Sequence, residues 1–382
     1  MPSKFIWQRP EWPDFRFDER LLAEPLRAAA FEQGEVAGAL RTLGRDDLDR
    51  AQFDALTDTI RETSEIEGEH LRPESIRASL TRRLAFGDAS PDATDPRADG
   101  VVAMTIDAMK RAGEPLTRER LFRWHDELFA DAPRSLTVGA WRVPADDPMR
   151  VSSGPAGSEI IHFEAPPAAH IDEAMSAFLT WFENQHASPA LLTAALAHLW
   201  FVTIHPFADG NGRIARAIGD LAVARREPRI APYVSLARQI RKDRTLYYDT
   251  LEETQRANLD VTTWMLWFVA CYRRAIAATL RSIDDLTQAN HFWNDRAGTE
   301  FNARQRKVLE RVLAGGFDGW INSSKYAKIA GTSPDTAQRD ILDLVAKGVV
   351  VANDPATRKK TYRLSREAAE IPHSAVRELK TR

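Results

Sequence analysis

One short stretch of this 382-residue chain, HPFADGNGRIAR at positions 205–216, concentrates the side chains best suited to chemistry on a phosphate. His205 could act as a general base, because an imidazole exchanges protons near neutral pH. Asp209 could bind a metal ion. Arg213 and Arg216 could each hold phosphate oxygens with a planar guanidinium group. The stretch therefore predicts transfer of a phosphate-bearing group.

Two helices are expected to position this stretch. Residues 189–203 have apolar side chains at the 3.6-residue spacing of a helix, and a second apolar stripe runs over residues 212–225. The run between them is typical of a turn, because glycine accepts positive φ angles. We expect the backbone N–H groups of Gly210, Asn211 and Gly212 to form an anion-binding nest at the positive end of the second helix.

Taken singly, these residues also have ordinary structural explanations. A histidine before a proline commonly belongs to a turn, and Arg216 could form an ion pair with Asp220 one turn farther along the helix. Their joint occurrence in this order, between two helices, favours a phosphate site over a loop.

The stretch resembles the active-site motif of the Fic (Fic/Doc) family, His-Pro-Phe-x-Asp/Glu-Gly-Asn-Gly-Arg-x-x-Arg, and every specified position is filled. The resemblance implies a helical catalytic core. It also implies a protein adenylyltransferase, which moves AMP from ATP to a Tyr, Thr or Ser hydroxyl of a target protein, or of itself, and releases pyrophosphate. In relatives that act as kinases, lysine stands at the position of Gly212, so glycine here favours nucleotidyl transfer.

Carried over residue by residue, the resemblance gives each side chain of the motif a role. His205 would take the proton from the target hydroxyl, and Phe207 would anchor the loop in the core. Asp209 would hold Mg²⁺ on the phosphates of ATP, for which one carboxylate is enough because this ion keeps several waters. The phosphates would be bound by Gly210, Asn211, Gly212, Arg213 and Arg216.

A second motif, TSEIEG at positions 63–68, resembles the inhibitory pattern Ser/Thr-x-x-x-Glu-Gly/Asn of the same family. The resemblance implies that Glu67 pairs with Arg216 and disturbs binding of the γ-phosphate of ATP. Thr63 and Glu67 would lie one turn apart on one helix face, and Gly68 would remove a side chain where the helix approaches the nucleotide. The alternative is a solvated acidic stretch, since glutamate recurs here at every second position.

Upstream of the main motif, an irregular segment is interrupted by glycine and proline. In the family that it resembles, a β-hairpin beside the active site pairs with the target backbone and presents its hydroxyl, as an added strand would. Residues 149–152 and 159–162 are the expected arms, and an ordinary surface loop is the alternative. The residues expected to dock the target are Val151, Ser152, Ile160, Ile161 and His162.

Two adjacent tyrosines follow the motif, in the segment ARQIRKDRTLYYDTLEE. The resemblance places part of the adenine pocket on this helix, and an aromatic ring can stack on a purine. We expect Tyr248 to bind ATP and Tyr247 to face the core. Aromatic residues on a helix are more often core residues, which is the alternative for both.

From about residue 297 the pattern changes to that of a winged helix-turn-helix. The predicted elements are helices at residues 302–313, 323–330 and 334–347 and strands at 349–351 and 361–364. Ser333 and Pro334 are typical of a helix start. DNA contact and docking of a protein or dimer partner both stay open. The wing would carry the basic residues Arg358, Lys359 and Lys360, and the third helix carries the acidic residues Asp335, Asp340 and Asp343.

The whole chain is predicted to be mainly α-helical, with three domains and a tail. A helical N-terminal domain that carries the inhibitory motif covers residues 1–110, and the Fic-like core with its hairpin covers residues 111–290. A small α/β winged helix-turn-helix follows at 297–368, and the tail covers 369–382. The chain is long enough for more than one hydrophobic core.

Composition narrows the class of protein. The net charge is −3, so no overall field attracts nucleic acid, and the longest apolar run is too short to span a bilayer. One cysteine excludes an internal disulfide framework, and the 9 scattered histidines include no zinc-like cluster. We expect a cytoplasmic protein that uses ATP and Mg²⁺, acts on a protein substrate, has no membrane contact and could form a homodimer.

Two other functions stay open. The same fold could remove AMP from a target, or catalyse both reactions, since a glutamate at position 67 can position water. The chain could instead be a DNA-binding regulator with a weak or vestigial Fic-like core, although the complete motif argues against this.

Overall fold

The computed structural model describes residues 4–84, 95–133, 136–144, 148–154, 158, 160–313, 320–353 and 360–365. These residues are mainly helical, as the sequence predicts, and include two antiparallel sheets of two strands each. The chain divides into two compact units, residues 1–279 and 280–382, and helix α11 (Thr262–Asp295) contributes residues to both.

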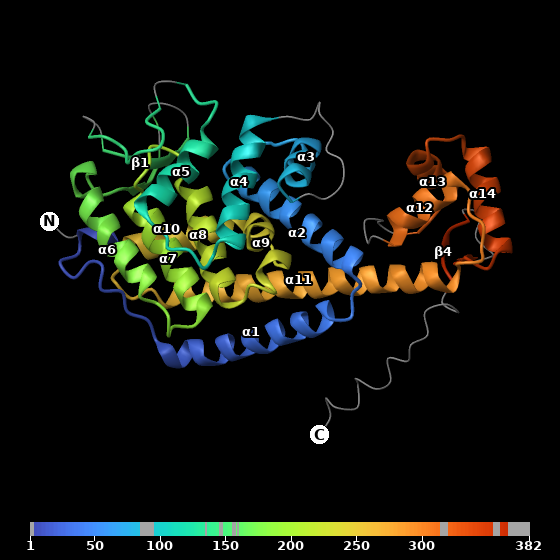
Figure 1. Ribbon diagram of the computed structural model, residues 1–382, viewed down its shortest axis with the longest axis horizontal. Helices are drawn as coiled ribbons and strands as arrows, with labels where there is room; N and C mark the ends of the chain where they lie inside the picture. The colour runs from blue at the N-terminus through green and yellow to red at the C-terminus, as the bar shows by residue number, and fades with distance from the viewer. Residues whose placement is uncertain are drawn as a thin grey trace. The chain divides into compact units, whose positions relative to one another are not determined.

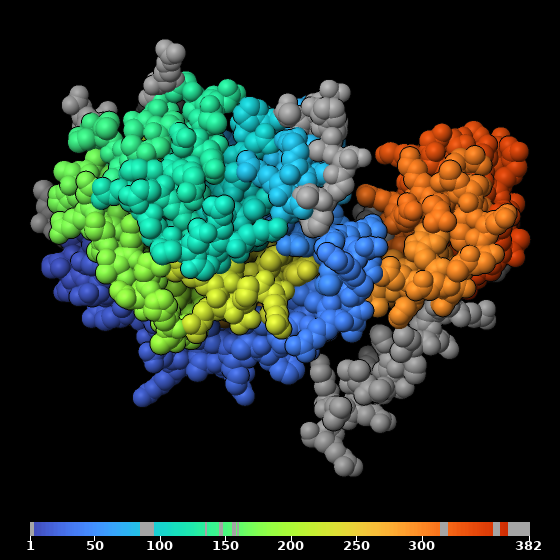
Figure 2. All heavy atoms as spheres, in the orientation of Figure 1, coloured from blue at the N-terminus to red at the C-terminus, as the bar shows by residue number. Residues whose placement is uncertain are grey.

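The first unit consists of helices and one hairpin (Figure 1). Strands β1 and β2 pair antiparallel to each other and to no other named strand. In the space-filling view, the segment around α5, drawn in teal, spreads over the face that is seen (Figure 2). In chain order the elements are η1 (Ile6–Gln8), α1 (Glu19–Leu40), α2 (Arg45–Ile66), α3 (Pro73–Leu84), α4 (Pro96–Lys110), α5 (Arg118–Leu128), β1 (Arg150–Ser153), β2 (Ile160–Glu164), η2 (Ala168–His170), α6 (Ile171–Glu183), α7 (Ala190–Ile204), α8 (Asn211–Arg226), η3 (Ala231–Tyr233), α9 (Leu236–Lys242), α10 (Arg244–Arg256) and the first part of α11.

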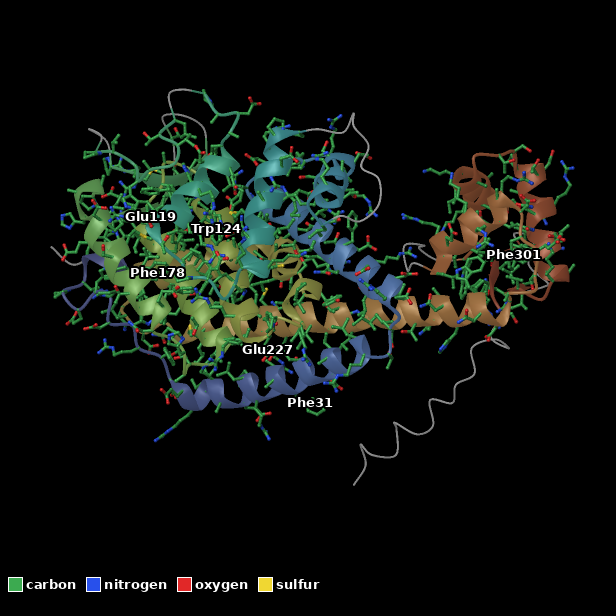
Figure 3. All side chains as sticks on the ribbon, in the orientation of Figure 1. Phe31, Glu119, Trp124, Phe178, Glu227 and Phe301 are labelled. Atoms are coloured by element: carbon green, nitrogen blue, oxygen red, sulfur yellow. The ribbon has the colours of Figure 1, made fainter. Side chains whose placement is uncertain are left out.

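Helices α7 and α8 form the centre of this unit, and both confirm the predicted helices to within one residue at each end. α7 is apolar on every side, and its residues 193–204 are all buried. Figure 3 shows buried Phe178 and Trp124 within the helical body, whereas Phe31 projects from α1 and is 69% exposed. The apolar character of α7 reflects burial in protein: no helix in the described part of the chain is long and apolar enough to cross a membrane.

Two N-terminal helices, α2 and α4, contact α8, and α2 also packs against α9. α4 packs closely against α5 because Gly100 has no side chain. A Cβ at this position would lie 2.0 Å from the backbone oxygen of Glu127. The backbones of α4 and α5 are therefore in direct contact. Because α4 also packs against α8, this contact holds α5 close to α8.

The described part of the second unit contains the end of α11 and then three further helices and a hairpin, which follow in the order that the sequence predicts. Ser333 caps the third helix by accepting a hydrogen bond from the N–H group of Thr336 at 3.2 Å. Ile321 forms a single antiparallel bridge with Tyr362 of the second strand of this hairpin. Arg358 and Lys359 of the predicted wing and the tail at 369–382 lie outside the described residues. The elements are α12 (Ala303–Leu313), α13 (Ser323–Ala330), α14 (Pro334–Ala346), β3 (Val350–Ala352) and β4 (Tyr362–Leu364).

Gly100→Ala is expected to lower the free energy of unfolding by about 1–3 kcal/mol, because the added methyl group forces two helix backbones apart. Gly34→Ala is the matched control: it lies in α1 with no atom within 4 Å of the new Cβ, so stability should be kept or slightly raised. Urea unfolding followed by tryptophan fluorescence measures both. Equal stability of the two variants would contradict the close contact of α4 with α5.

Candidate functional site

His205 ends α7 in a left-handed conformation, with φ of 53°. Its Nδ1 lies 3.2 Å from the backbone oxygen of Val202, which places the ring proton on Nδ1 and leaves a lone pair on Nε2. Burial lowers the pKa of the imidazole to about 4, so the ring is neutral at physiological pH. A neutral imidazole with an available Nε2 can serve as a general base.

The loop that follows His205 is closed by the side chain of Asn211. Its Oδ1 accepts a hydrogen bond from the N–H group of Phe207 at 3.0 Å, and its Nδ2 donates to the backbone oxygen of Phe207 at 2.9 Å. Phe207 is fully buried and anchors the loop in the core. The Asn211 side chain is thus committed to the loop, which leaves its backbone N–H group for an anion.

The start of α8 offers free backbone donors. Gly210 precedes the helix with φ of 78°, and its N–H group donates to Oδ1 of Asp209 at 2.6 Å. The N–H groups of Asn211 and Gly212 have no hydrogen-bond partner among the described residues, because the first turn of a helix leaves them unpaired. These two donors, at the positive end of α8, are two of the three N–H groups in the nest that the sequence predicts, and the third, that of Gly210, is taken by Asp209.

Arg216 is buried and faces the end of α2. Its Nε donates to Oγ1 of Thr63 at 2.7 Å, and its Nη2 donates to Oε1 of Glu67 at 2.7 Å. Its Nη1 is also buried, and no group in the described part of the chain accepts a hydrogen bond from it. Arg216 therefore turns toward α2 and not toward Asp220, whose pKa burial raises to about 7.

The carboxylate of Glu67 covers the start of α8. A Cβ added to Gly212 would lie 2.1 Å from Oε1 of Glu67, so the carboxylate stands in front of the helix N-terminus, where an anion would bind. Gly68, which follows, has φ of 81°, and a Cβ there would meet nothing within 4 Å. Glycine suits position 68 because of this backbone conformation, and the space beside it, which the sequence analysis assigns to a nucleotide, is open in the described structure.

Arg213 is equally buried but pairs with a different acid. Its Nη1 donates to Oε2 of Glu69 at 2.6 Å, a contact that sequence reasoning missed. The guanidinium carbon lies 5.0 Å from the ring centre of Phe129, and the side chain is 3% exposed. Nε of Arg213 is buried without a hydrogen-bond partner in the described segments. Each arginine of the motif thus keeps a buried donor nitrogen for which the described residues offer no acceptor.

Asp209 lies on the open side of the loop. Its side chain is 63% exposed, and Oδ1 lies 4.0 Å from Nη2 of Arg213. It borders a depression of about 370 Å³ that Glu69, Arg97 and Asp131 also line. Among the described residues no three His, Cys, Asp or Glu side chains could together hold a metal ion. A cation at Asp209 would therefore take most of its ligands from water or from a bound phosphate, which suits Mg²⁺.

Two residues that the sequence analysis did not single out support the loop from behind. His125 of α5 accepts a hydrogen bond from the N–H group of Gly139 at 3.0 Å, and its other ring nitrogen lies 3.2 Å from the backbone oxygen of Asp209. Burial lowers the pKa of His125 to about 4. Nε of Arg142 donates to the backbone oxygen of His205 at 2.8 Å. Neither residue stands near the motif in sequence, so spacing alone gave no signal for them.

The predicted hairpin forms, with strands shifted from the expected arms. β1 begins at Arg150 and β2 extends to Glu164, while Glu159 lies outside the described residues. The pairing shifts between Val151 and Ser152, so that His162 is the extra residue on β2. Its Nδ1 lies 2.6 Å from Oε2 of Glu252 in α10. His162 thus fastens the hairpin to α10. Of the five residues expected to dock the target, Val151, Ser152 and Ile160 are exposed.

The two tyrosines of α10 have different surroundings. Tyr247 is buried, and its hydroxyl lies 3.0 Å from Nε2 of His198. Tyr248 is half-buried, and its hydroxyl donates to the backbone oxygen of Ile66 at 3.4 Å. Tyr248 therefore lies beside the end of α2, where it contacts the residue that precedes Glu67.

Residues 115–223 match the family described as Fic/DOC, and residues 5–86 match a domain of unknown function, DUF4172. "Protein adenylyltransferase Fic" of Nematostella vectensis is 34% identical over 122 residues, which are 31% of this chain and 26% of that protein. The protein of the same name from Drosophila melanogaster is 30% identical over 118 residues, 30% of this chain and 22% of its own length. This chain thus spans about a quarter of the curated relatives that it matches.

A crystal structure of a Fic family protein from Desulfovibrio desulfuricans has a similar fold, with a TM-score of 0.51 and 21% identity, over 89% of this chain and 96% of that one. The matched segment of this chain includes α5 with His125, the hairpin, α7 and the complete motif at 205–216. Residues 115–223 of this protein are therefore a Fic/DOC family domain.

Proposed function

We propose that this protein is an adenylyltransferase, which transfers AMP from ATP to a hydroxyl group of a target protein or of itself and releases pyrophosphate. One observation carries the proposal: Nη1 of Arg216 is buried without an acceptor in the described structure and lies 3.2 Å from the Cβ position of Gly212, at the helix start where the N–H groups of Asn211 and Gly212 are also unpaired. A buried donor without a partner costs about 1–3 kcal/mol, and a bound phosphate would satisfy it. The relatives named protein adenylyltransferase support ATP as the donor of AMP.

The reaction would be a displacement at the α-phosphorus of ATP. The acceptor hydroxyl oxygen forms a bond to this phosphorus while the bond to the bridging oxygen of pyrophosphate breaks. Nε2 of His205 takes the hydroxyl proton, since its ring is neutral and Nδ1 is held by Val202. The N–H groups of Asn211 and Gly212 stabilise the charge on the phosphate oxygens.

Asp209 is the residue that would hold Mg²⁺. Its carboxylate is mostly exposed and has one oxygen that is not used by Gly210. Bound Mg²⁺ would neutralise charge on the leaving pyrophosphate. Arg213 would hold the β-phosphate and Arg216 the γ-phosphate, each through a guanidinium that is fixed in place by burial.

Glu67 would keep this activity low in the resting protein. Its charge-assisted bond to Arg216 removes a guanidinium from the γ-phosphate, and its carboxylate adds negative charge where the phosphate must lie. Thr63 supports the inhibited state, because its hydroxyl accepts a hydrogen bond from the same guanidinium.

Two further contacts would complete substrate binding. Tyr248 would stack on the adenine ring from its half-buried place beside Ile66. The hairpin would align the target backbone along β1. That edge is favoured because Arg256 of α10 already donates to the backbone oxygens of Ile161 and His162 on β2.

A protein is the proposed partner of the C-terminal unit, in preference to DNA. Leu342 and Val345, three residues apart on α14, are 50% and 37% exposed, which favours an apolar contact. Asp335 is exposed on the same helix and would repel DNA phosphates, whereas the charge of Asp343 is paired with Lys347 at 2.6 Å. Asp340 is buried and does not bear on the choice. Selection of the target protein is the role we assign to this unit.

His205→Ala is expected to reduce AMP transfer by about 10²–10⁴-fold, the usual loss for a general base. Binding of ATP should persist, because the arginines and N–H groups remain. The assay is incorporation of labelled AMP, measured in the Glu67→Gly background, with exposed His170→Ala as control. Since the depressed pKa keeps His205 neutral, the rate should show no acidic limb near pH 6.5. Near-normal transfer by His205→Ala would exclude this residue as the base.

Asp209→Ala should raise the Mg²⁺ concentration that half-maximal transfer requires. It should also slow transfer at saturation, because Mg²⁺ would no longer be held where it neutralises charge on the leaving pyrophosphate. Titration of Mg²⁺ in the labelling assay measures both effects. Transfer that continues unchanged in EDTA would rule out the metal role.

Glu67→Gly is expected to raise transfer about ten- to a hundredfold, since a charge-assisted hydrogen bond contributes about 1.5–3 kcal/mol. Self-labelling with ATP is the readout. Glu65→Gly is the matched control, because Glu65 lies in the last turn of α2 but pairs with a different arginine. Its Oε2 lies 3.6 Å from Nε of Arg241 in α9. Arg216→Ala should abolish the gain.

A Glu67→Gly variant that is silent or less active than the wild type would contradict inhibition by Glu67. That result would favour the removal of AMP from a target, with Glu67 positioning the attacking water.

A further inference from the structure

A second acid from the end of α2 is paired with the first arginine of the motif. Oε2 of Glu69 lies 2.6 Å from Nη1 of Arg213, and the arginine side chain is 3% exposed. We propose that Glu69 limits how tightly the site binds nucleotides that carry a β-phosphate, by competing with this phosphate for Arg213. The proposal rests on the function proposed above.

The turn that follows α2 holds both acids. The N–H group of Gly68 donates to the backbone oxygen of Glu65 at 3.1 Å, and that of Glu69 donates back to Ser64 at 2.9 Å. With Gly68 in the left-handed region, these bonds form a Schellman turn. The two glutamates that flank Gly68 are thus held in fixed positions, and each meets a different arginine of α8.

The two acids affect the site in different ways. Oε1 of Glu67 lies 2.1 Å from the Cβ position of Gly212 and so blocks the helix N-terminus itself. Glu69 is 33% exposed and lines the depression beside Asp209, so it supplies negative charge at the edge of the site. Together they neutralise two buried guanidinium groups. Loss of Glu67 alone therefore leaves Arg213 still paired.

The two glutamates should therefore differ in how they affect the binding of ADP and of ATP. ADP keeps the β-phosphate, which is assigned to Arg213, but lacks the γ-phosphate, which is assigned to Arg216. Loss of the Glu69 charge should therefore strengthen binding of both ADP and ATP. Loss of Glu67 should strengthen binding of ATP more than that of ADP.

Calorimetric titration of ADP and ATP, each with Mg²⁺, tests this on the full-length wild type, Glu67→Gly, Glu69→Gln and the double variant. Glutamine keeps the shape of Glu69 and can still accept a hydrogen bond from Arg213, but it carries no charge. We expect Glu69→Gln to bind ADP about tenfold more tightly than the wild type does. Because Glu69 is partly exposed, this gain should shrink as the salt concentration rises.

Asp131→Asn is the matched control, since Asp131 lines the same depression but is not paired with Arg213 in the described structure. Its affinity for ADP should stay close to that of the wild type. Equal gains in Glu69→Gln and Asp131→Asn, or weaker ADP binding by Glu69→Gln, would overturn the proposal.

The binding measurement separates this inference from the proposed function. If ADP affinity responds to Glu69 as expected while no variant transfers AMP, the adenylyltransferase proposal fails and the control of nucleotide affinity by Glu69 stands. If the double variant binds neither nucleotide, both proposals are overturned.

Discussion

The site depends on the burial of two guanidinium groups at the start of α8. A cation removed from water is stable only with hydrogen-bond acceptors and countercharge around it. In this protein the end of α2 supplies them, through Thr63, Glu67 and Glu69. The N-terminal helices are thus a structural part of the site, since residues 5–86 provide the acids and residues 115–223 the arginines.

The parts of this structure that could be predicted from sequence are local ones. α7 and α8 were predicted to within one residue, because an apolar helix followed by a glycine-containing turn is recognisable in one stretch of chain. α14 was predicted equally well from Ser333 and Pro334, whose preferences act within one helical turn. The side chains at 205–216 come together for the same reason, since the stretch itself forms the loop and the helix start.

The parts that could not be predicted depend on contacts between distant segments. His125 and Arg142 reach the loop only through the packing of α5 and the segment after it, and Glu69 reaches Arg213 across 144 residues. An isolated histidine, arginine or glutamate carries no periodic signal that would reveal such a contact. The extra residue on β2 was missed because hairpin register depends on which face α10 covers, and not on the hairpin sequence alone.

The turn at residues 66–69 links the two ends of the nucleotide site that we propose. The backbone oxygen of Ile66 accepts a hydrogen bond from Tyr248, and the side chain of the next residue, Glu67, accepts one from Arg216. A nucleotide that displaced Glu67 would therefore also disturb the attachment of α2 to α10. A partner that loosened α2 would therefore strengthen nucleotide binding. Coupling between two binding events is reciprocal, so the nucleotide would strengthen the binding of that partner by the same factor. The end of α2 would then couple the N-terminal helices to the Fic/DOC domain.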